Sequence, residues 1–256
     1  MSEFILQTIG LGKNFGSIVA LRHIDFNIKP GEVVGIVGDN GAGKSTFIKT
    51  LSGAHKQSKG SIVFEDNVVE FNSPKEAIST GIETVYQDLA LAPHLDIASN
   101  IFLGRELTKP GFLGKLGVRN REAMEEKTTE VLDRLKIKVK SIRQPVGTLS
   151  GGQRQCVAIA RAVAWGSKVV ILDEPTAALG VEESAKVLDL IANMKENGIA
   201  VILISHTMPH VIQACDRICV FRLGESVTML NKSDTTVDEL VMWITGTKTV
   251  ENSVAQ

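Results

Sequence analysis

The stretch that most constrains the fold is the glycine-rich run GDNGAGKST, which occupies residues 38–46. It follows the apolar run EVVGIVG at 32–38, which predicts a buried strand. It precedes STFIKTLSG, which predicts a helix from Ser45 that closes at Gly53. A strand, a G-x-x-x-x-G-K-[ST] loop and a helix in this order predict a phosphate-binding loop at the edge of an α/β sheet.

The loop predicts which atoms would meet the phosphates. Its glycines let backbone N–H groups curl around phosphate oxygens, and the N-terminus of the following helix adds a partial positive charge. Lys44 is expected to reach the β- and γ-phosphates, and Ser45 to bind Mg²⁺. The predicted phosphate-binding residues are Gly38, Asp39, Asn40, Gly41, Ala42, Gly43, Lys44, Ser45 and Thr46.

A phosphate loop alone does not distinguish ATPases, GTPases and kinases, so the acidic run VVILDEP at 169–175 is needed. Its apolar residues predict a buried strand that presents two carboxylates at its carboxyl end, where open α/β sheets bind ligands. We expect Asp173 to hold Mg²⁺ through the metal's water shell. Glu174 is then the candidate general base that polarises the attacking water.

Two further polar side chains follow predicted strands. His206 follows the apolar run AVILIS and is expected to sense the γ-phosphate. Gln87 ends the run IETVYQ and offers an amide to Mg²⁺ or to water, at the point where the sheet gives way to a helical segment. The run NKSD at 231–234 matches a guanine-reading motif, but it follows a predicted hairpin, and the acidic strand reads LDEP where GTPases have D-x-x-G.

The remaining pattern predicts one domain over 1–256 with an inserted part. Strands and helices alternate over 1–87 and 148–256, whereas 88–147 has few strand signals and one amphipathic helix, NREAMEEKTTEVLDRLKIK. Residues 1–29 and the hairpin that turns at Leu223-Gly224 predict antiparallel strands. LTKPGFLGKLG reads as a loop, and Thr236 and Glu239 stand at capping-box spacing before a last helix.

Composition excludes several classes of protein. The formal net charge of -1 over 256 residues provides no basic surface for nucleic acid. No apolar run approaches the roughly 20 residues that span a bilayer, and the first residues lack the pattern of a secretion signal. The three cysteines show no metal-type pairing and indicate reduced, structural thiols in a cytosolic chain.

A second glycine-rich stretch, TLSGGQRQ at 148–155, precedes another helical run. Together with GDNGAGKST, YQ, ILDEP and SH in this order, its pentapeptide LSGGQ resembles the nucleotide-binding subunit of an ABC transporter over nearly the whole chain. The resemblance implies a P-loop NTPase (RecA-like) core with an antiparallel β-subdomain and a helical subdomain. It also implies an ATP-hydrolysing, transport-coupled enzyme with ATP and Mg²⁺ as its ligands.

The resemblance also explains why one chain has two phosphate-binding motifs, here called cradles: the loop at 38–46 and the pentapeptide LSGGQ at 149–153. It implies that Ser150, Gly151, Gly152 and Gln153 bind the γ-phosphate of ATP held by Lys44 of a second copy. Two copies would then form a head-to-tail homodimer with two ATPs between them. It further implies that Phe15, in KNFG, stacks on adenine.

A finer resemblance is to ATP subunits of ribose-, xylose- and fructose-type monosaccharide importers, carried by SNIFLGRE at 99–106 and by DEPTAALG. It implies membrane permease partners, indirectly a periplasmic sugar-binding protein, and a place on the cytoplasmic face of the membrane. The alternatives are an ABC ATPase for another solute, or one for nucleic-acid maintenance or translation. The family often ends the next loop in Ser-Ala-Leu-Asp, so Gly180 predicts weaker cross-talk between the two sites, or cross-talk through the backbone.

Overall fold

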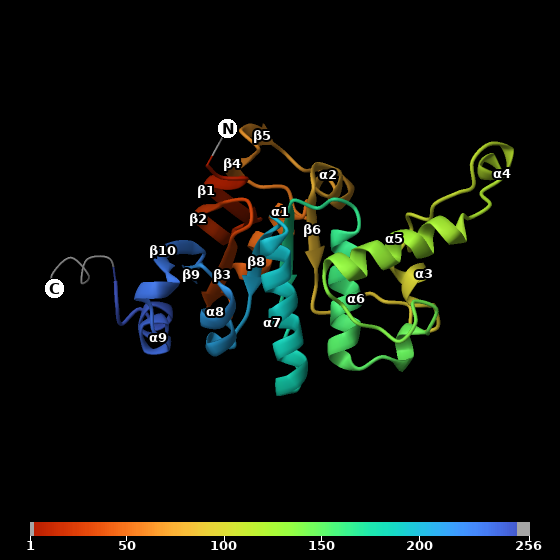
Figure 1. The fold of residues 1–256 in the computed structure, drawn as a ribbon. Helices are drawn as coiled ribbons and strands as arrows, with labels where there is room; N and C mark the ends of the chain where they lie inside the picture. The colour runs from red at the N-terminus through yellow and green to blue at the C-terminus, as the bar shows by residue number, and fades with distance from the viewer. Residues whose placement is uncertain (1–2, 250–256) are drawn as a thin grey trace.

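Five parallel strands form the centre of the computed structural model, which describes residues 3–249. Their side chains are almost entirely buried and mostly Val, Ile and Leu, as expected for strands covered on both faces. Along the sheet they follow the order β9, β3, β8, β7 and β6 (Figure 1). Their bounds are Arg217–Arg222, Val33–Gly38, Ala200–Ile204, Val169–Asp173 and Ile82–Val85.

The sheet continues beyond β9 into an antiparallel part. β10 pairs antiparallel with β9 and parallel with β2 at Glu225 and His23, so the ten strands within residues 3–249 form one sheet in the order β5-β4-β1-β2-β10-β9-β3-β8-β7-β6. This matches the antiparallel strands predicted for the N-terminal residues and for the hairpin. The antiparallel strands are β1 (Leu6–Phe15), β2 (Ile18–Ile28), β4 (Lys59–Phe64), β5 (Asn67–Val69) and β10 (Glu225–Asn231).

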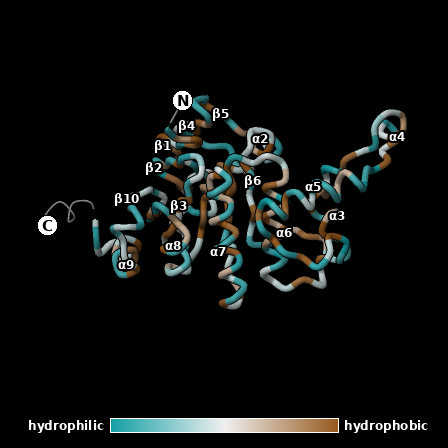
Figure 2. The backbone as a smooth tube through the Cα atoms, viewed as in Figure 1, coloured by the Kyte–Doolittle hydropathy of each residue, from teal (hydrophilic) through white to brown (hydrophobic). Residues whose placement is uncertain are grey.

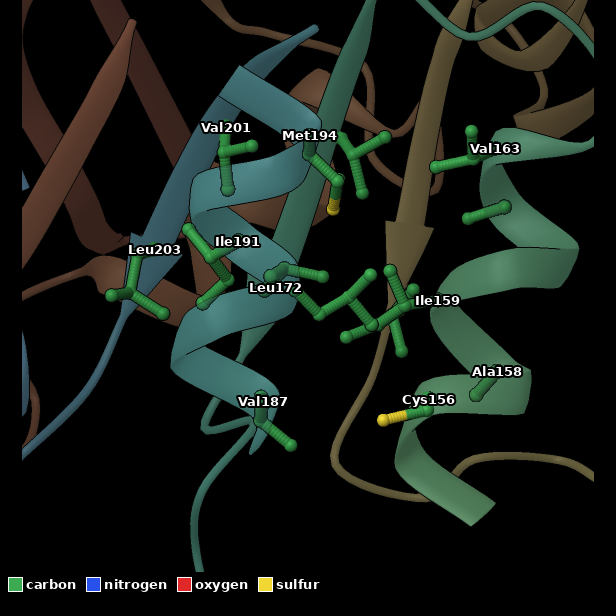
Figure 3. Close-up of a cluster of buried hydrophobic side chains, with 14 of the residues drawn as sticks. Cys156, Ala158, Ile159, Val163, Leu172, Val187, Ile191, Met194, Val201 and Leu203 are labelled. Carbon is green, nitrogen blue, oxygen red and sulfur yellow. The ribbon is translucent and has the colours of Figure 1, made fainter. Parts of the chain in front are cut away.

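Helices cover the sheet and enclose two apolar clusters. One cluster lies where α6 and α7 pack beside β7 and β8, with Ile159, Leu172 and Ile191 in contact range (Figure 3). The second joins the antiparallel strands to α1 through Phe26, Phe47 and Phe221. The helices outside the insert are α1 (Lys44–Leu51), α2 (Pro74–Thr80), α6 (Gly151–Val163), α7 (Val181–Glu196), α8 (Met208–Ala214) and α9 (Val237–Thr245).

The segment 88–147 extends away from the sheet, and its helices cover less than half of its residues, so the prediction of a mostly helical segment was too strong. It contains α3 (Ile97–Ile101), α4 (Phe112–Lys115) and α5 (Arg121–Arg134), and α4 lies at the tip of a projecting arm (Figure 1). α3 and α5 pack on each other and on α6, so their apolar residues join the first cluster. Hydrophilic residues predominate along α5 (Figure 2), and its buried residues are Met124, Thr128, Val131 and Leu132, in keeping with the amphipathic pattern.

Several local predictions need correction. β6 ends at Val85, so Gln87 lies beyond the strand and not at its end. The segment LTKPGFLGKLG is not all loop, because it contains the single turn of α4. Only half of the predicted capping box forms: the Thr236 hydroxyl accepts from the Glu239 backbone N–H, while the Glu239 carboxylate binds Lys248.

The three cysteines lie in the core, as the prediction of structural thiols required. Cys156, Cys215 and Cys219 are free and buried, and burial raises the pKa of Cys156 to about 11. Across the described residues 3–249, no helix combines the length and the apolar character that crossing a bilayer would require.

Candidate nucleotide-binding site

An open cleft of about 820 Å³ lies at the carboxyl ends of the parallel strands. It is bounded by the phosphate loop, by the acidic end of β7 and by the residues that follow β8. Most of the predicted site residues share it, although they come from widely separated parts of the sequence. The lining includes Asp39, Asn40, Gly41, Ala42, Gly43, Lys44, Ser45, Thr46, Gln87, Asp173, Glu174 and His206.

The glycines of the loop adopt backbone conformations that other residues would resist. Gly38 has φ 155°, and a Cβ built on it would lie 2.3 Å from the carbonyl oxygen of Phe221. Gly43, the N-cap of α1, has φ 105°, and its Cβ would lie 2.7 Å from Leu21. The loop therefore packs against β9 and β2 on one side and presents its backbone to the cleft on the other.

Lys44 is buried at the base of the cleft. Its Nζ donates hydrogen bonds to the carbonyl oxygens of Gly38, at 2.6 Å, and Asp39, at 3.0 Å. Burial lowers the pKa of the ammonium group, and the carboxylates of Glu174, Asp39 and Asp173 oppose that shift. The cation is thus anchored to the loop and directed toward the place where an anion would bind.

Asp173 and Glu174 stand opposite the loop, at the end of β7. Burial is the largest influence on both carboxyl groups and raises the pKa of each, against the attraction of Lys44 and His206. Glu174 has φ 53°, and its Oε2 accepts from the His206 backbone N–H at 3.3 Å. Its buried Oε1 has no hydrogen-bond partner within residues 3–249, although His206 Nε2 lies 3.3 Å away.

The donor set of the cleft fits a hard cation. Ser45, Gln87 and Asp173 offer a hydroxyl, an amide and a carboxylate, and Mg²⁺ in proteins is usually held by one or two such groups, waters and substrate phosphates. Within the described residues, no group of three or more His, Cys, Asp or Glu side chains forms a metal cluster. The arrangement therefore suits a cation that arrives with a phosphate ligand.

Phe15 stands apart from the other predicted contacts. It is the last residue of β1, its side chain is 42% exposed, and its ring packs edge-on against His55 with centroids 5.1 Å apart. It does not line the cleft, whereas Ile18 and Val19 just after it do.

The pentapeptide LSGGQ at 149–153, called the signature below, also lies outside the cleft. Ser150 is the N-cap of α6, where its Oγ accepts from the Gln153 N–H at 3.3 Å and its own N–H donates to Gln153 Oε1 at 3.0 Å. None of residues 150–153 lines the cleft that holds Lys44. Within one subunit the two predicted phosphate cradles are therefore separate sites.

The cleft also contains residues that sequence reasoning missed. They come from the start of β2, the end of β8 and the residues after it, the turn after β9, and the residues after the acidic strand. Of these, the sequence predicts only the turn at Leu223-Gly224, as a hairpin turn and not as part of the site. They are Ile18, Val19, Ala20, Arg22, Ala177, Ile204, Thr207, Leu223 and Gly224.

Comparison with known proteins identifies the family. Residues 21–177 match the family model described as ABC transporter. The chain belongs to the ABC transporter family. The predicted resemblance is thereby confirmed, together with the P-loop α/β fold and the class of transport-coupled ATPase.

Several relatives align along nearly the whole of this ABC subunit. A fructose import ATP-binding protein from Rhizobium meliloti is 51% identical over 96% of this chain and 95% of its own length. A xylose/arabinose import ATP-binding protein from Sulfolobus acidocaldarius is 47% identical over 92% of each chain. A ribose import ATP-binding protein from Bacillus subtilis is 38% identical over 93% of this chain but only 47% of its own.

Solved structures of the family share the fold. The ADP conformation of an ATP-binding cassette of an ABC transporter superimposes with a TM-score of 0.81 at 26% identity and covers 100% of both chains. A cassette in a dimeric post-hydrolysis state bound to ADP and Pi superimposes with a TM-score of 0.71 at 26% identity, over 89% of this chain and 98% of that one. The second neighbour is a dimer.

The raised pKa of Glu174 predicts how its replacement changes stability. Below pH 4.5 the carboxyl is protonated in both the folded and the unfolded chain, so burial costs nothing extra. As the pH rises from 4.5 through the raised folded pKa, the unfolded chain loses its proton first and the folded state loses stability. Glu174→Gln should therefore raise the Tm of the nucleotide-free protein near about pH 8, by an amount that shrinks toward pH 4.5.

Calorimetry across this pH range checks the prediction, with Glu182→Gln as the control. Glu182 is an exposed carboxylate in the first turn of α7, so its replacement removes the same charge without relieving any burial. An unchanged or lower Tm for Glu174→Gln near about pH 8 would contradict the inferred penalty.

Proposed function

We propose that this chain is the ATP-hydrolysing subunit of an importer of a monosaccharide. The observation that carries the proposal is the presence, in one subunit, of a phosphate cleft and of a second phosphate cradle on α6 that this cleft does not contain. The family relation supports ATP as the nucleotide, and the printed names of the relatives support a sugar as the solute.

Different residues of the cleft would bind different parts of MgATP. Backbone N–H groups of 38–46 surround the phosphates, and Lys44 extends from its carbonyl anchors to the β- and γ-phosphates. Ser45, Gln87 and Asp173 would hold Mg²⁺, which supplies neutralisation of developing phosphate charge when bound. Ile18 and Val19 provide an exposed apolar surface for the adenine beside Phe15, which would complete the stack from β1.

Glu174 supplies the base for hydrolysis. Its buried Oε1 makes no hydrogen bond within residues 3–249, so it can accept a proton from water at the γ-phosphate. The His206 backbone N–H donates to the other oxygen, which fixes the direction of the carboxylate. The His206 imidazole, 53% exposed, lines the cleft with its Nε2 3.3 Å from Glu174 Oε1, and it would donate to the γ-phosphate.

The signature helix completes the site of a second copy. Ser150, Gly151 and Gly152 place a hydroxyl and backbone N–H groups at the start of a 13-residue helix, which favours a phosphate. Gln153 closes the capping box that holds Ser150. Bound to the γ-phosphate of the partner's ATP, these donors would close a head-to-tail homodimer and release it after hydrolysis.

The transport role adds partners that this chain does not contain. The closed and open dimer would drive a membrane permease, which would receive its solute from a periplasmic sugar-binding protein. The chain would then work on the cytoplasmic face of the membrane, with the segment 88–147 beside Gln87 as the surface for the permease. The relatives favour fructose, xylose, arabinose or ribose over a non-sugar solute, and the near-neutral charge gives no support to a nucleic-acid role.

Replacing the base should separate binding from hydrolysis. Glu174→Gln retains Lys44, both cradles and the Mg²⁺ ligands, so it should bind MgATP and accumulate as a dimer. Its turnover should fall by roughly 10²–10⁴-fold, the usual contribution of a general base. Phosphate release and light scattering after gel filtration check both effects, with ADP as the nucleotide control. Turnover at the wild-type rate would exclude Glu174 as the base.

Mixing two inactive variants tests whether the site is shared. Lys44→Ala disables the phosphate loop of its own chain, and Ser150→Arg disables the cradle offered to the partner. Each variant alone has no intact site, but a mixed dimer has one, made of Lys44 from one chain and Ser150 from the other. We expect each variant to be inactive alone and their mixture to recover part of the ATPase activity.

The design distinguishes the shared site from a site within one chain. If both residues served the same ATP in the same subunit, no mixture would contain an intact site and activity would stay absent. A mixture of Lys44→Ala with itself at the same total concentration is the control.

Isolation from membranes tests the transport role. Tagged Glu174→Gln protein, loaded with MgATP and recovered from cells that take up a monosaccharide, should bring a multi-span permease with it. Deleting the gene for this chain should abolish uptake of that sugar, and the wild-type chain but not Lys44→Ala should restore it. Unchanged uptake of every pentose and hexose tested would contradict the sugar assignment.

A further inference from the structure

The donors of the signature helix already have an anion beside them within the subunit. Glu183, in the first turn of α7, faces the start of α6. A Cβ built on Gly152 would lie 2.8 Å from the Cβ of Glu183, and one built on Gly151 would lie 3.6 Å from Glu183 Oε2. The first turns of α6 and α7 therefore meet at the Glu183 carboxylate. It fits there because Gly151 and Gly152 have no Cβ.

The groups beside this carboxylate are the same ones that a phosphate would use. The Ser150 hydroxyl and the backbone N–H groups of Gly152 and Gly180 favour the charged form of Glu183 and, in this order of size, lower its pKa. The Ser150 Oγ accepts from the Gln153 N–H, which leaves its one proton available to Glu183. Lys186, one turn further along α7, adds a weaker attraction.

We infer that Glu183 is a further residue of the shared ATP site: it occupies the signature donors in the separated subunit, and the partner's γ-phosphate displaces it when the dimer closes. The inference rests on the proposed function, because it assumes that the signature receives a phosphate from a second copy. A hydroxyl has one proton, so Ser150 cannot donate to Glu183 and to a phosphate at once. A carboxylate left beside the γ-phosphate would also repel it.

Displacement of Glu183 also connects the two ATP sites. The backbone N–H of Gly180, the position where the family often has an aspartate, also lowers the pKa of Glu183. Gly180 is the N-cap of α7 and ends the loop that begins at Glu174. When a phosphate takes the donors of α6, the carboxylate of Glu183 no longer connects the start of α7 to them. The loop that leads back to the base of the subunit's own site is then released from that anchor.

Neutralising Glu183 without changing its shape tests the inference. In a Glu174→Gln background, Glu183→Gln leaves an amide oxygen that accepts from the same donors more weakly than a carboxylate. The partner's phosphate should then displace it more readily, so half-maximal dimerisation should need about fivefold less MgATP. Replacing a hydrogen bond to a charged acceptor by one to a neutral acceptor changes an equilibrium constant by about this factor. Glu182→Gln in the same background is the matched control, because it removes the same charge one residue earlier.

Analytical ultracentrifugation over a MgATP titration gives the result, and thermal unfolding without nucleotide shows that both double variants have the same fold. Because its neighbours lower the pKa of Glu183, Glu183→Gln should also lower the Tm without nucleotide. Displacement predicts that this variant nevertheless dimerises at less MgATP, whereas a purely structural role predicts a lower Tm together with weaker dimerisation. Equal titration curves for the two variants, or weaker dimerisation of Glu183→Gln, would overturn the inference while leaving the shared site intact. A Glu174→Gln parent that stays monomeric at every MgATP concentration would overturn the shared site itself, and the inference with it.

Discussion

The register of the parallel strands is the constraint on which the site depends. Asp173 of β7 pairs with Ile204 of β8, and Ile204 pairs with Ile36 of β3, so the three residues share one level across the sheet. The residues just beyond that level are Glu174, His206 and the glycine that opens the phosphate loop. A shift of one residue in any strand would turn its side chains to the other face and separate the carboxylates from the lysine.

The same strand ends bring three charged side chains into a partly buried place, where loss of water disfavours their charged forms. Lys44, Asp173 and Glu174 each have a pKa displaced toward the neutral form, and burial is the largest cause in all three cases. Lys44 attracts the two carboxylates, but Asp173 and Glu174 repel each other, and the attraction does not offset the penalty of burial. The nucleotide-free subunit thus keeps a strained, incompletely paired cleft, which is the arrangement that an anion with its own cation would relieve.

The elements that follow a simple period were predictable, and those that depend on neighbours were not. The buried strands and the helix over Val181–Glu196 follow from continuous apolar runs and from Asn197-Gly198 at the helix end. The short helix Pro74–Thr80 was missed despite Ser73 and Pro74 at its start, because seven residues carry too little periodicity. The turn Phe112–Lys115 was missed because most of its apolar side chains face solvent at the tip of the arm.

The candidate site shows the same division. Motif spacing placed Lys44, Asp173, Glu174 and His206 in one cleft, because the carboxyl ends of parallel strands converge. Ile18 and Val19 carry no motif and reach the cleft only because β2 passes beside α1. The contact between Glu183 and Ser150 joins positions 33 residues apart and depends on two glycines that bring α6 and α7 together.

A site shared by two subunits must open after hydrolysis as well as close when ATP binds. A γ-phosphate carries more charge and more acceptor oxygens than a carboxylate, so it can take the donors of α6 from Glu183. After hydrolysis the released phosphate diffuses away, whereas the carboxylate is tethered to α7 and stays at a high effective concentration beside the same donors. The Glu183 carboxylate therefore regains the donors of α6 once the γ-phosphate is no longer joined to the nucleotide. The direction of the cycle follows from this difference in attachment.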